Sequence, residues 1–344
     1  MMDTLPTGLS TLLMELYGLD RADLIPGIDR GYSGDNFVIS DSESKYFVKK
    51  YHLKRSRELI EEIHNASKFF YERGVPAIAP LVNVKGESVF EYEGRYLAVF
   101  PYINATELAI LPSGHTVASI GSTLARLHLA SKDDSTLAIS RPVDRWTKDK
   151  FLSKAQELQS KIESIDSPND FDVMAKEFLK LKILLAEKGN THFEELGLKD
   201  DAVLHGDYHY LNMFFDNEGN VSHLFDFERV RRGDRAAELA YGLFFNCFDM
   251  NKTSVDTLSE VHFSRAKDYL SAYTKLYPLS TEKIANGIRW YYWSQMVHQL
   301  WPLDAHYLAG NTRADNLASI RLNRLKYFAA NLDSFLSTLP NQLH

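Results

Sequence analysis

The chain has 344 residues, of which 44% are hydrophobic and 25% are charged, and its net charge is −7. This composition predicts a globular protein with a large core in two lobes, and the negative charge argues against nucleic acid as a partner. One cysteine excludes a disulfide framework, and because neither a signal peptide nor a membrane-spanning run is visible, we expect a cytoplasmic protein with no membrane partner.

The first hundred residues predict a small mixed lobe. One helix is expected over residues 56–73, where Leu59, Ile63, Ala66 and Phe70 recur at helical spacing. Short runs rich in aromatic and β-branched residues, separated by turn residues, predict the strands. These predicted strands are residues 36–40, 45–51, 81–85, 87–91 and 95–100.

After residue 101 the pattern becomes mainly helical. Helices are expected over 115–131, 146–165 and 170–188, and again from 234 to the end. Strand-like runs interrupt them between residues 202 and 227, around a turn at 216–219. We therefore expect an α+β fold, with an N-terminal lobe of residues 1–101 and a C-terminal lobe of residues 102–344.

One loop and one strand end carry the residues with the clearest chemistry. Asp207 and Asn212 lie five residues apart in the string His205-Gly206-Asp207-Tyr208-His209-Tyr210-Leu211-Asn212, and Asp226 follows beyond the turn. Carboxylate and amide oxygens of this kind hold a magnesium-bound nucleotide and orient a hydroxyl group. The pattern therefore indicates phosphoryl transfer.

Four strings of this chain resemble signatures of the aminoglycoside phosphotransferase, choline kinase and homoserine kinase group. They are His205-Gly206-Asp207 with Asn212, Leu224-Phe225-Asp226-Phe227-Glu228, Gly233-Asp234 followed by Glu238-Leu239-Ala240, and Leu124-Ala125-Arg126-Leu127-His128. The resemblance covers residues 32–245 and implies a bilobal protein-kinase-like fold that uses ATP and Mg²⁺ to phosphorylate a small-molecule hydroxyl. Two residues depart from the group's pattern, Arg235 in place of Pro and Glu238 in place of Asp, and we expect both to tune the start of a helix.

The resemblance assigns roles to the catalytic residues. It implies that Asp207 lies beside the acceptor hydroxyl as base or orienting group. Asn212 and Asp226 would hold Mg²⁺, and Asp226 would also bridge the metal to the phosphates. Lys49, in Tyr46-Phe47-Val48-Lys49, would meet the α- and β-phosphates with Glu62 as its partner.

Two of these assignments have competitors. Lys50 competes with Lys49, but strand alternation allows only one of them to face the nucleotide, and the following Tyr51 favours Lys49. Glu61 competes with Glu62, because the register of the helix is uncertain by one residue.

Further contacts are expected around the nucleotide and the acceptor. Ser33 and Asn36, in the small-residue segment 31–36, would cover the phosphates, although an ordinary turn fits as well. Val99 would border the adenine pocket, and the backbone of Phe100 and Tyr102 would meet the adenine edge. The candidate acceptor contacts are His209, Glu228 and Tyr292.

The aromatic run 290–293 is where the group builds acceptor contacts. Its large rings are nevertheless more often buried for packing than used to bind a ligand. Asp304, like Glu228, could bind an amine.

Three other functions compete with a small-molecule kinase. A bacterial stress-response Ser/Thr protein kinase fits the same strings, and a non-catalytic pseudokinase is disfavoured because the Lys, Asp, Asn and Asp set is intact. A metallohydrolase built on His205, His209, His223 and Asp226 leaves Lys49 unexplained. The sequence identifies neither the acceptor nor the oligomeric state.

Overall fold

The computed structural model describes residues 4–26, 36–108, 110, 112, 114–140, 145, 147–189, 193–248 and 260–343. Its internal contacts divide the chain into two compact units. The first unit comprises residues 1–107, 133–140 and 211–230, and the second comprises residues 108–132, 141–210 and 231–344. The first unit therefore extends beyond the boundary expected at residue 101 and takes in a segment from the second half of the chain.

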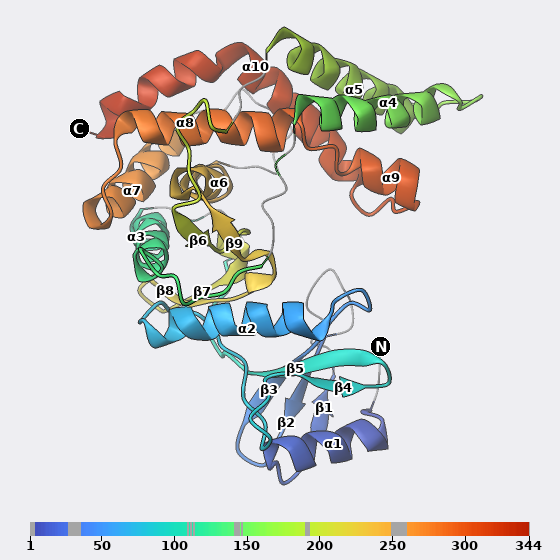
Figure 1. Ribbon diagram of the computed structural model, residues 1–344, viewed down its shortest axis with the longest axis vertical. Coiled ribbons are helices and arrows are strands. Elements are labelled where there is room, and N and C mark those ends of the chain that lie inside the picture. The colour runs from blue at the N-terminus through green and yellow to red at the C-terminus, as the bar shows by residue number, and fades with distance from the viewer. Residues whose placement is uncertain are drawn as a thin grey trace. The chain divides into compact units, whose positions relative to one another are not determined.

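The first unit contains a five-stranded antiparallel sheet with the strand order β1-β2-β3-β5-β4 (Figure 1). The predicted hairpin and helix are present as β2, β3 and α2. The elements are α1 (Thr7–Tyr17), β1 (Asp23–Ile25), β2 (Phe37–Ser40), β3 (Lys45–Lys50), α2 (Arg57–Glu72), β4 (Phe90–Tyr92) and β5 (Arg95–Pro101).

Each face of this sheet packs against a different helix. Leu13 of α1 packs with Val48 and Val99 in one buried cluster, whereas Ile60 of α2 packs with Ala98 in another. Because successive strand residues point to opposite faces, the side chain of Lys49 lies on the α2 face.

The structure differs from the sequence-based expectation between residues 81 and 91. Residues 81–85 form no strand, because the Asn83 side chain accepts hydrogen bonds from the backbone N–H groups of Lys85 and Glu87 and closes a local turn. The expected strand over 87–91 is shortened to β4. Helix α1 and strand β1 were not predicted.

A short hairpin from the second half of the chain completes the first unit. Its elements are the 3-10 turn η1 (Tyr210–Asn212), β7 (Met213–Phe215), β8 (Val221–Leu224) and the 3-10 turn η2 (Phe227–Arg229). Leu224 in β8 exchanges backbone hydrogen bonds with Pro76 and Ile78. Phe227 is buried and stacks on Phe70 of α2, with ring centroids 5.7 Å apart. Backbone pairing thus ties the hairpin to the segment that follows α2, and ring packing ties it to α2 itself.

The second unit is mainly helical, as expected. A two-stranded sheet of β6 and β9 is its only sheet among the described residues. The elements are α3 (His115–Ala130), α4 (Lys148–Glu163), α5 (Asp170–Lys188), β6 (Ala202–Leu204), β9 (Arg231–Gly233), α6 (Arg235–Cys247), α7 (Glu260–Leu276), α8 (Thr281–Tyr291), a π-helix (Tyr292–Val297), α9 (Leu303–Ala309) and α10 (Asp315–Leu343).

Glycines allow the helices around α6 to approach closely. A Cβ atom on Gly287 of α8 would lie 2.2 Å from the backbone oxygen of Ala236 in α6. A Cβ atom on Gly121 of α3 would lie equally close to the backbone oxygen of Tyr269 in α7. Only glycine fits at these two helix crossings.

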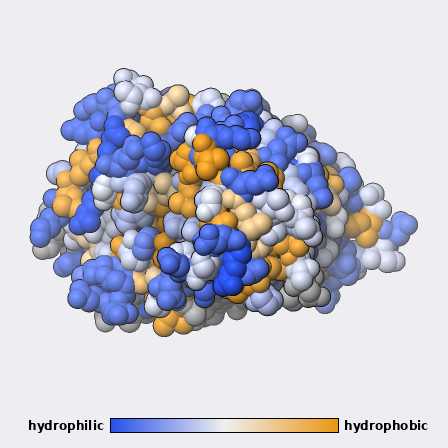
Figure 2. All heavy atoms as spheres, turned by 90° about the horizontal axis from the view of Figure 1, so that it is seen from below, coloured by the Kyte–Doolittle hydropathy of each residue, from blue (hydrophilic) through white to orange (hydrophobic). Residues whose placement is uncertain are grey.

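Hydrophilic and hydrophobic side chains are interspersed over the face seen in Figure 2. Single exposed apolar side chains such as Leu53 and Val84 are common on protein surfaces and need no special explanation. Within the part of the chain that the structure describes, no helix is both long enough and apolar enough to span a membrane.

A buried histidine of α2 is expected to make the first unit sensitive to acid. Burial and the nearby Lys49 charge lower the pKa of His64 to about 3. Its ring nitrogens contact the hydroxyl groups of Tyr51 and Ser88, each at 2.8 Å. Between pH 3 and about 6.5 the unfolded chain therefore binds a proton that the folded chain does not, so acid favours unfolding.

We predict that the free energy of unfolding falls as the pH is lowered from 6.5, with His64 contributing up to about 1.4 kcal/mol per pH unit. His64→Gln should give a shallower slope in denaturant titrations between pH 7 and pH 4. His52→Gln, at an exposed position of the same unit, should leave the slope unchanged. Equal slopes for His64→Gln and the unmodified protein would contradict the prediction.

Candidate active site

Lys49 is the centre of a charged cluster in the first unit. Its Nζ lies 3.1 Å from Oδ1 of Asp226 and 2.6 Å from Oε1 of Glu228. Lys50 points to the opposite face of the sheet, and its backbone N–H donates a hydrogen bond to Oδ1 of Asn36. Lys49 is thus the lysine that meets the carboxylates.

The carboxylates keep Lys49 protonated. Burial alone would lower the pKa of Lys49, but the charges of Asp226 and then Glu228 outweigh it and hold the pKa above its usual value. The ammonium group also lies 5.5 Å from the ring centroid of Tyr51. The first unit therefore presents a fixed positive charge at all physiological pH values.

Glu228 bridges two cations. Its Oε1 contacts Lys49, and its Oε2 lies 3.1 Å from a guanidinium nitrogen of Arg55. The predicted pairing of Lys49 with Glu62 is wrong for this structure, because Oε2 of Glu62 accepts hydrogen bonds from the backbone N–H and hydroxyl of Ser140. The alternative Glu61 pairs with Arg57. Glu228 thus takes the place that the sequence assigned to the helix glutamate.

Asp226 faces Lys49 because the backbone changes direction at this residue. Its φ of 64° is in the left-handed region, which Asp adopts more readily than most residues and which is common at functional sites. The next residue, Phe227, is anchored against α2. The turn and the anchor together fix the position of the Asp226 carboxylate.

Asn212 lies at the same end of the β7–β8 hairpin as Asp226. Its backbone oxygen accepts a hydrogen bond of 3.0 Å from the N–H of Phe225, the residue that precedes Asp226. Asn212 is 7% exposed. An amide side chain and a carboxylate side chain are therefore held on neighbouring positions of one hairpin.

The other residues predicted to contact the nucleotide do not share one face of the sheet. Ser33 lies outside the described residues. The Val99 side chain packs on the α1 face of the sheet, opposite Lys49, and its place beside the adenine pocket stays a prediction. The Phe100 side chain lies on the α2 face of the sheet, as Lys49 does. The backbone N–H of Tyr102 donates a hydrogen bond of 3.3 Å to the backbone oxygen of Lys45.

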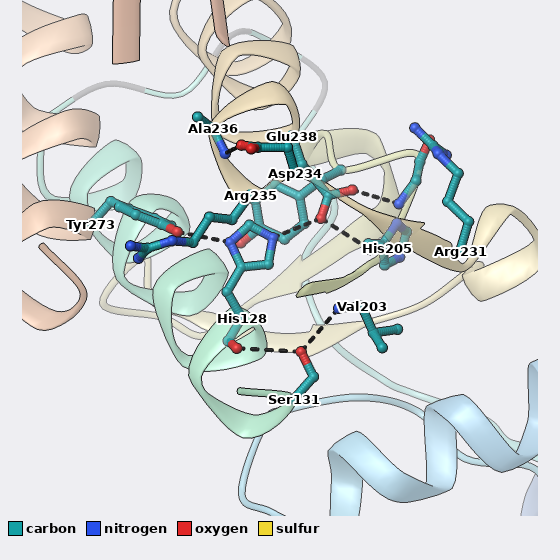
Figure 3. A network of polar contacts seen from close by, with 12 residues as sticks. His128, Ser131, Val203, His205, Arg231, Asp234, Arg235, Ala236, Glu238 and Tyr273 are labelled. Atoms are coloured by element: carbon teal, nitrogen blue, oxygen red, sulfur yellow. Dashed lines mark hydrogen bonds and ion pairs between the residues drawn. The ribbon is translucent and has the colours of Figure 1, made fainter. Parts of the chain in front are cut away.

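In the second unit, Glu238 holds the loop that follows β6. This residue of α6 is 3% exposed, and its carboxylate accepts hydrogen bonds from the backbone N–H groups of His205 and Gly206. Figure 3 shows Glu238 directed at this loop, with Arg231 on the far side. A guanidinium nitrogen of Arg231 donates to the oxygen of Gly206 at 3.2 Å. The loop backbone is thus fixed by side chains from α6 and β9.

A histidine of α3 completes the environment of Glu238. Nε2 of His128 lies 3.0 Å from Oε2 of Glu238, and Nδ1 lies 2.9 Å from the hydroxyl of Tyr273 (Figure 3). Burial would raise the pKa of Glu238, but the hydrogen bond to His128 and the charges of His128, His205 and Arg231 outweigh it and lower the pKa. Glu238 is therefore an ionised carboxylate inside the protein.

Asp207 follows directly after the two residues that Glu238 holds. Its Oδ1 accepts a hydrogen bond of 2.6 Å from the hydroxyl of Tyr241, and Nε2 of His209 lies 3.6 Å from the same oxygen. Its backbone N–H donates to Nδ1 of His205 at 3.3 Å. His205 is fully buried, and this hydrogen bond joins its ring to the loop backbone.

Comparisons with known proteins identify the family. Residues 25–272 match the phosphotransferase enzyme family. The chain belongs to this family. It is therefore an enzyme, a phosphotransferase that acts on a hydroxyl group, and the predicted family resemblance is confirmed.

Individual relatives of this phosphotransferase are distant. The homoserine kinase of Bartonella henselae is 24% identical over 262 residues, which cover 74% of this chain and 72% of that protein. The solved structure of spectinomycin phosphotransferase APH(9)-Ia in complex with ADP and spectinomycin has a TM-score of 0.61, 15% identity, and 99% coverage of both chains. A microcompartment-associated aminopropanol kinase also has a TM-score of 0.61, with 12% identity and coverage of 97% of this chain and 98% of that one. These structures confirm the α+β protein-kinase-like fold.

The residues of this phosphotransferase fit a magnesium-bound triphosphate better than a protein-only metal site. Among the described residues, no group of three or more His, Cys, Asp or Glu could hold a metal ion. Magnesium bound together with a nucleotide needs only one or two protein carboxylates, because phosphates and water supply the other oxygens. Asn212 and Asp226, at one end of the hairpin, meet that requirement.

Both departures from the family pattern have structural roles. Glu238 does more than place charge near a helix start, because it holds the backbone N–H groups of His205 and Gly206. Arg235 has a backbone N–H that Pro would lack, and it donates to Oδ1 of Asp201 at 3.2 Å. Asp234 provides the N-cap by accepting from Ala236.

Two contact residues were not predicted from the sequence. Arg55 pairs with Glu228, and Tyr241 binds Asp207, although neither was singled out. Tyr241 follows Glu238 by three residues and so lies on the same face of α6, which is the signal that could have identified it. Of the aromatic run, Tyr292 is buried, and it is Tyr291 that packs near Tyr241.

The charged cluster predicts that Glu228 matters more than Glu62 for nucleotide use. Glu228→Gln should raise KM for ATP by about tenfold or more, because it weakens the ion pairs that hold the side chains of Lys49 and Arg55 in position. Glu62→Gln should change KM for ATP less than twofold. Steady-state kinetics with varied ATP measures both effects, and the reverse order would contradict the assignment.

The hydrogen bonds that Glu238 accepts from the loop predict that this residue affects the free energy of unfolding. Glu238→Gln should lower the free energy of unfolding by about 1–3 kcal/mol, because the new amide NH₂ would face a backbone N–H donor. Glu282→Gln, at an exposed position in the first turn of α8, should change it by less than about 0.5 kcal/mol. Urea titrations of both variants measure the difference, and equal stabilities would show that the loop does not depend on this carboxylate.

Proposed function

We propose that this phosphotransferase transfers the γ-phosphoryl group of ATP, with Mg²⁺, to the hydroxyl group of a small amine-bearing molecule such as homoserine. The observation that supports the reaction most directly is the Lys49–Asp226–Glu228 cluster beside Asn212. The similarity to homoserine kinase over 74% of the chain supports the acceptor class. An amino alcohol or an amino sugar is the next candidate, because spectinomycin phosphotransferase and an aminopropanol kinase share the fold.

The first unit supplies the nucleotide contacts. Lys49 is permanently charged and binds phosphate oxygens. Asn212 and Asp226 would hold Mg²⁺ through their side-chain oxygens, and the ion would neutralise charge on the phosphates. Glu228 and Arg55 keep Lys49 in place.

Asp207 acts on the acceptor. Its carboxylate accepts the hydrogen bond of the acceptor hydroxyl and takes the proton as the oxygen bonds to the γ-phosphorus. The bond between the γ-phosphorus and the bridging oxygen breaks in the same displacement, and ADP leaves with that electron pair. The products are ADP and a phosphate monoester, and no phosphorylated enzyme is formed.

The short connection after η2 favours a small acceptor over a protein. Only residues 228–233 separate Phe227 from Asp234, and β9 occupies the end of that segment. Protein kinases place a long activation segment with an Ala-Pro-Glu string at this point of the chain, and neither occurs here. A folded protein substrate is therefore included in the experiment below only as a comparison.

The acceptor is tested with labelled ATP and a panel of hydroxyl compounds. The panel contains homoserine, serine, an amino alcohol, an amino sugar and a generic protein substrate. We expect transfer to a small amine-bearing alcohol, and homoserine as the best acceptor. Transfer to the protein alone would replace the proposal with a protein kinase, and no transfer to any of them would refute it.

Substitution of the two aspartates should separate chemistry from nucleotide binding. Asp207→Asn should lower kcat by at least about 100-fold and leave ATP binding nearly unchanged, because it removes the base and not a nucleotide contact. Asp226→Ala should instead weaken ATP binding in the presence of Mg²⁺. Calorimetric titration and initial rates measure the two effects. Asp207→Asn with undiminished turnover would remove Asp207 from its assigned role.

A further inference from the structure

Helix α6 contacts the catalytic loop twice from one face. Glu238 holds the backbone N–H groups of the loop, and Tyr241, one turn later, reaches the Asp207 side chain. The hydroxyl of Tyr241 lies 2.6 Å from Oδ1 of Asp207, which is the distance of a strong hydrogen bond to a carboxylate. The same helix thus fixes both the backbone and the reactive side chain of the loop.

The ring of Tyr241 is itself held by aromatic neighbours. It stacks on Phe245, one turn further along α6, with ring centroids 4.6 Å apart. It also meets the edge of Tyr291 from α8, at 6.1 Å. Phe245 in turn lies 5.8 Å from the imidazole of His209. Packing on two sides restricts rotation of the phenol, so its hydroxyl stays directed at Asp207.

We propose that Tyr241 is a positioning residue for phosphoryl transfer, which acts by orienting the Asp207 carboxylate toward the acceptor hydroxyl. This inference rests on the proposed function of Asp207. A carboxylate on a loop rotates about its side-chain bonds, and one strong hydrogen bond from a fixed donor removes much of that freedom. Nε2 of His209 lies farther from the same oxygen, at 3.6 Å.

The role predicts a particular kinetic effect. Tyr241→Phe keeps the ring and its packing but removes the hydroxyl, so the fold should persist while Asp207 loses its orientation. We expect kcat to fall by about tenfold or more, with KM for ATP changed less than twofold, because the nucleotide contacts belong to other residues.

A second tyrosine of the same unit provides a matched control. The hydroxyl of Tyr307 donates to Oδ1 of Asp172 at 2.7 Å, and Asp172 is a buried capping residue of α5. Tyr307→Phe therefore removes the same kind of bond from a carboxylate with no role in the reaction. It should lower the melting temperature and leave kcat within twofold of the unmodified enzyme.

A double substitution shows whether Tyr241 acts through Asp207. In an Asp207→Ala background the hydroxyl has no carboxylate to orient, so adding Tyr241→Phe should reduce the residual rate less than twofold. The full loss seen in the single variant, repeated in this background, would show that Tyr241 acts independently of Asp207 and would overturn the inference.

The outcomes separate this inference from the proposed function. If the unmodified enzyme transfers phosphate and Tyr241→Phe matches it in kcat, the inference fails and the proposed function stands. If Tyr241→Phe lowers melting temperature and kcat only as Tyr307→Phe does, the tyrosine is structural and the inference also fails. If the unmodified enzyme transfers no phosphate to any acceptor, the proposed function itself fails.

Discussion

The ionised carboxylate of Glu238, buried in the second unit, is the constraint on which the loop that carries Asp207 depends. A buried charge is costly unless it is fully hydrogen-bonded, and Glu238 meets that condition with two backbone N–H groups and His128. Because the donors belong to residues 205 and 206, satisfying the carboxylate also fixes the backbone immediately before Asp207. The stability of this interior site and the position of Asp207 therefore have the same cause.

In the first unit it is a cation that is mostly buried, and neighbouring carboxylates keep it ionised. Lys49 is a mostly buried cation, and Asp226 and Glu228 supply the negative charge that keeps it ionised. Arg55 adds a second cation, so two positive and two negative side chains balance one another. In each unit a charge with little solvent access is kept ionised by partners that come from distant points of the sequence.

Sequence patterns predicted the parts of the site in which a residue type and a short spacing determine the geometry. Strand alternation allowed only one of Lys49 and Lys50 to face the site, and the following Tyr51 favoured Lys49. The strings around Asp207 and Asp226 located the loop and the hairpin end. The partner of Lys49 was missed because it depends on long-range packing: residues 133–140 bring Ser140 to Glu62, while the left-handed backbone at Asp226 directs the following segment to Lys49. No short sequence pattern predicts either of these two contacts.

Val99 and Tyr241 illustrate what a local sequence pattern leaves open. For Val99, the strand was correctly predicted, and the observed register with Val48 adds that its side chain points toward α1. For Tyr241, the helical spacing from Glu238 contained the information, but its target became evident only from the tertiary contact with Asp207. The spacing of residues shows which side chains lie on the same face of a helix or strand. It does not show which other part of the protein that face contacts.

The balanced cluster around Lys49 also indicates why a metal must accompany the nucleotide. A bare triphosphate would bring several negative charges to a group in which Asp226 and Glu228 already offset both cations, so repulsion from the carboxylates would oppose the attraction of Lys49. Under the proposed function Asp226 would be a ligand of Mg²⁺, so its carboxylate would no longer oppose the phosphates. Lys49 would then contact a phosphate oxygen while Glu228 and Arg55 keep it in position.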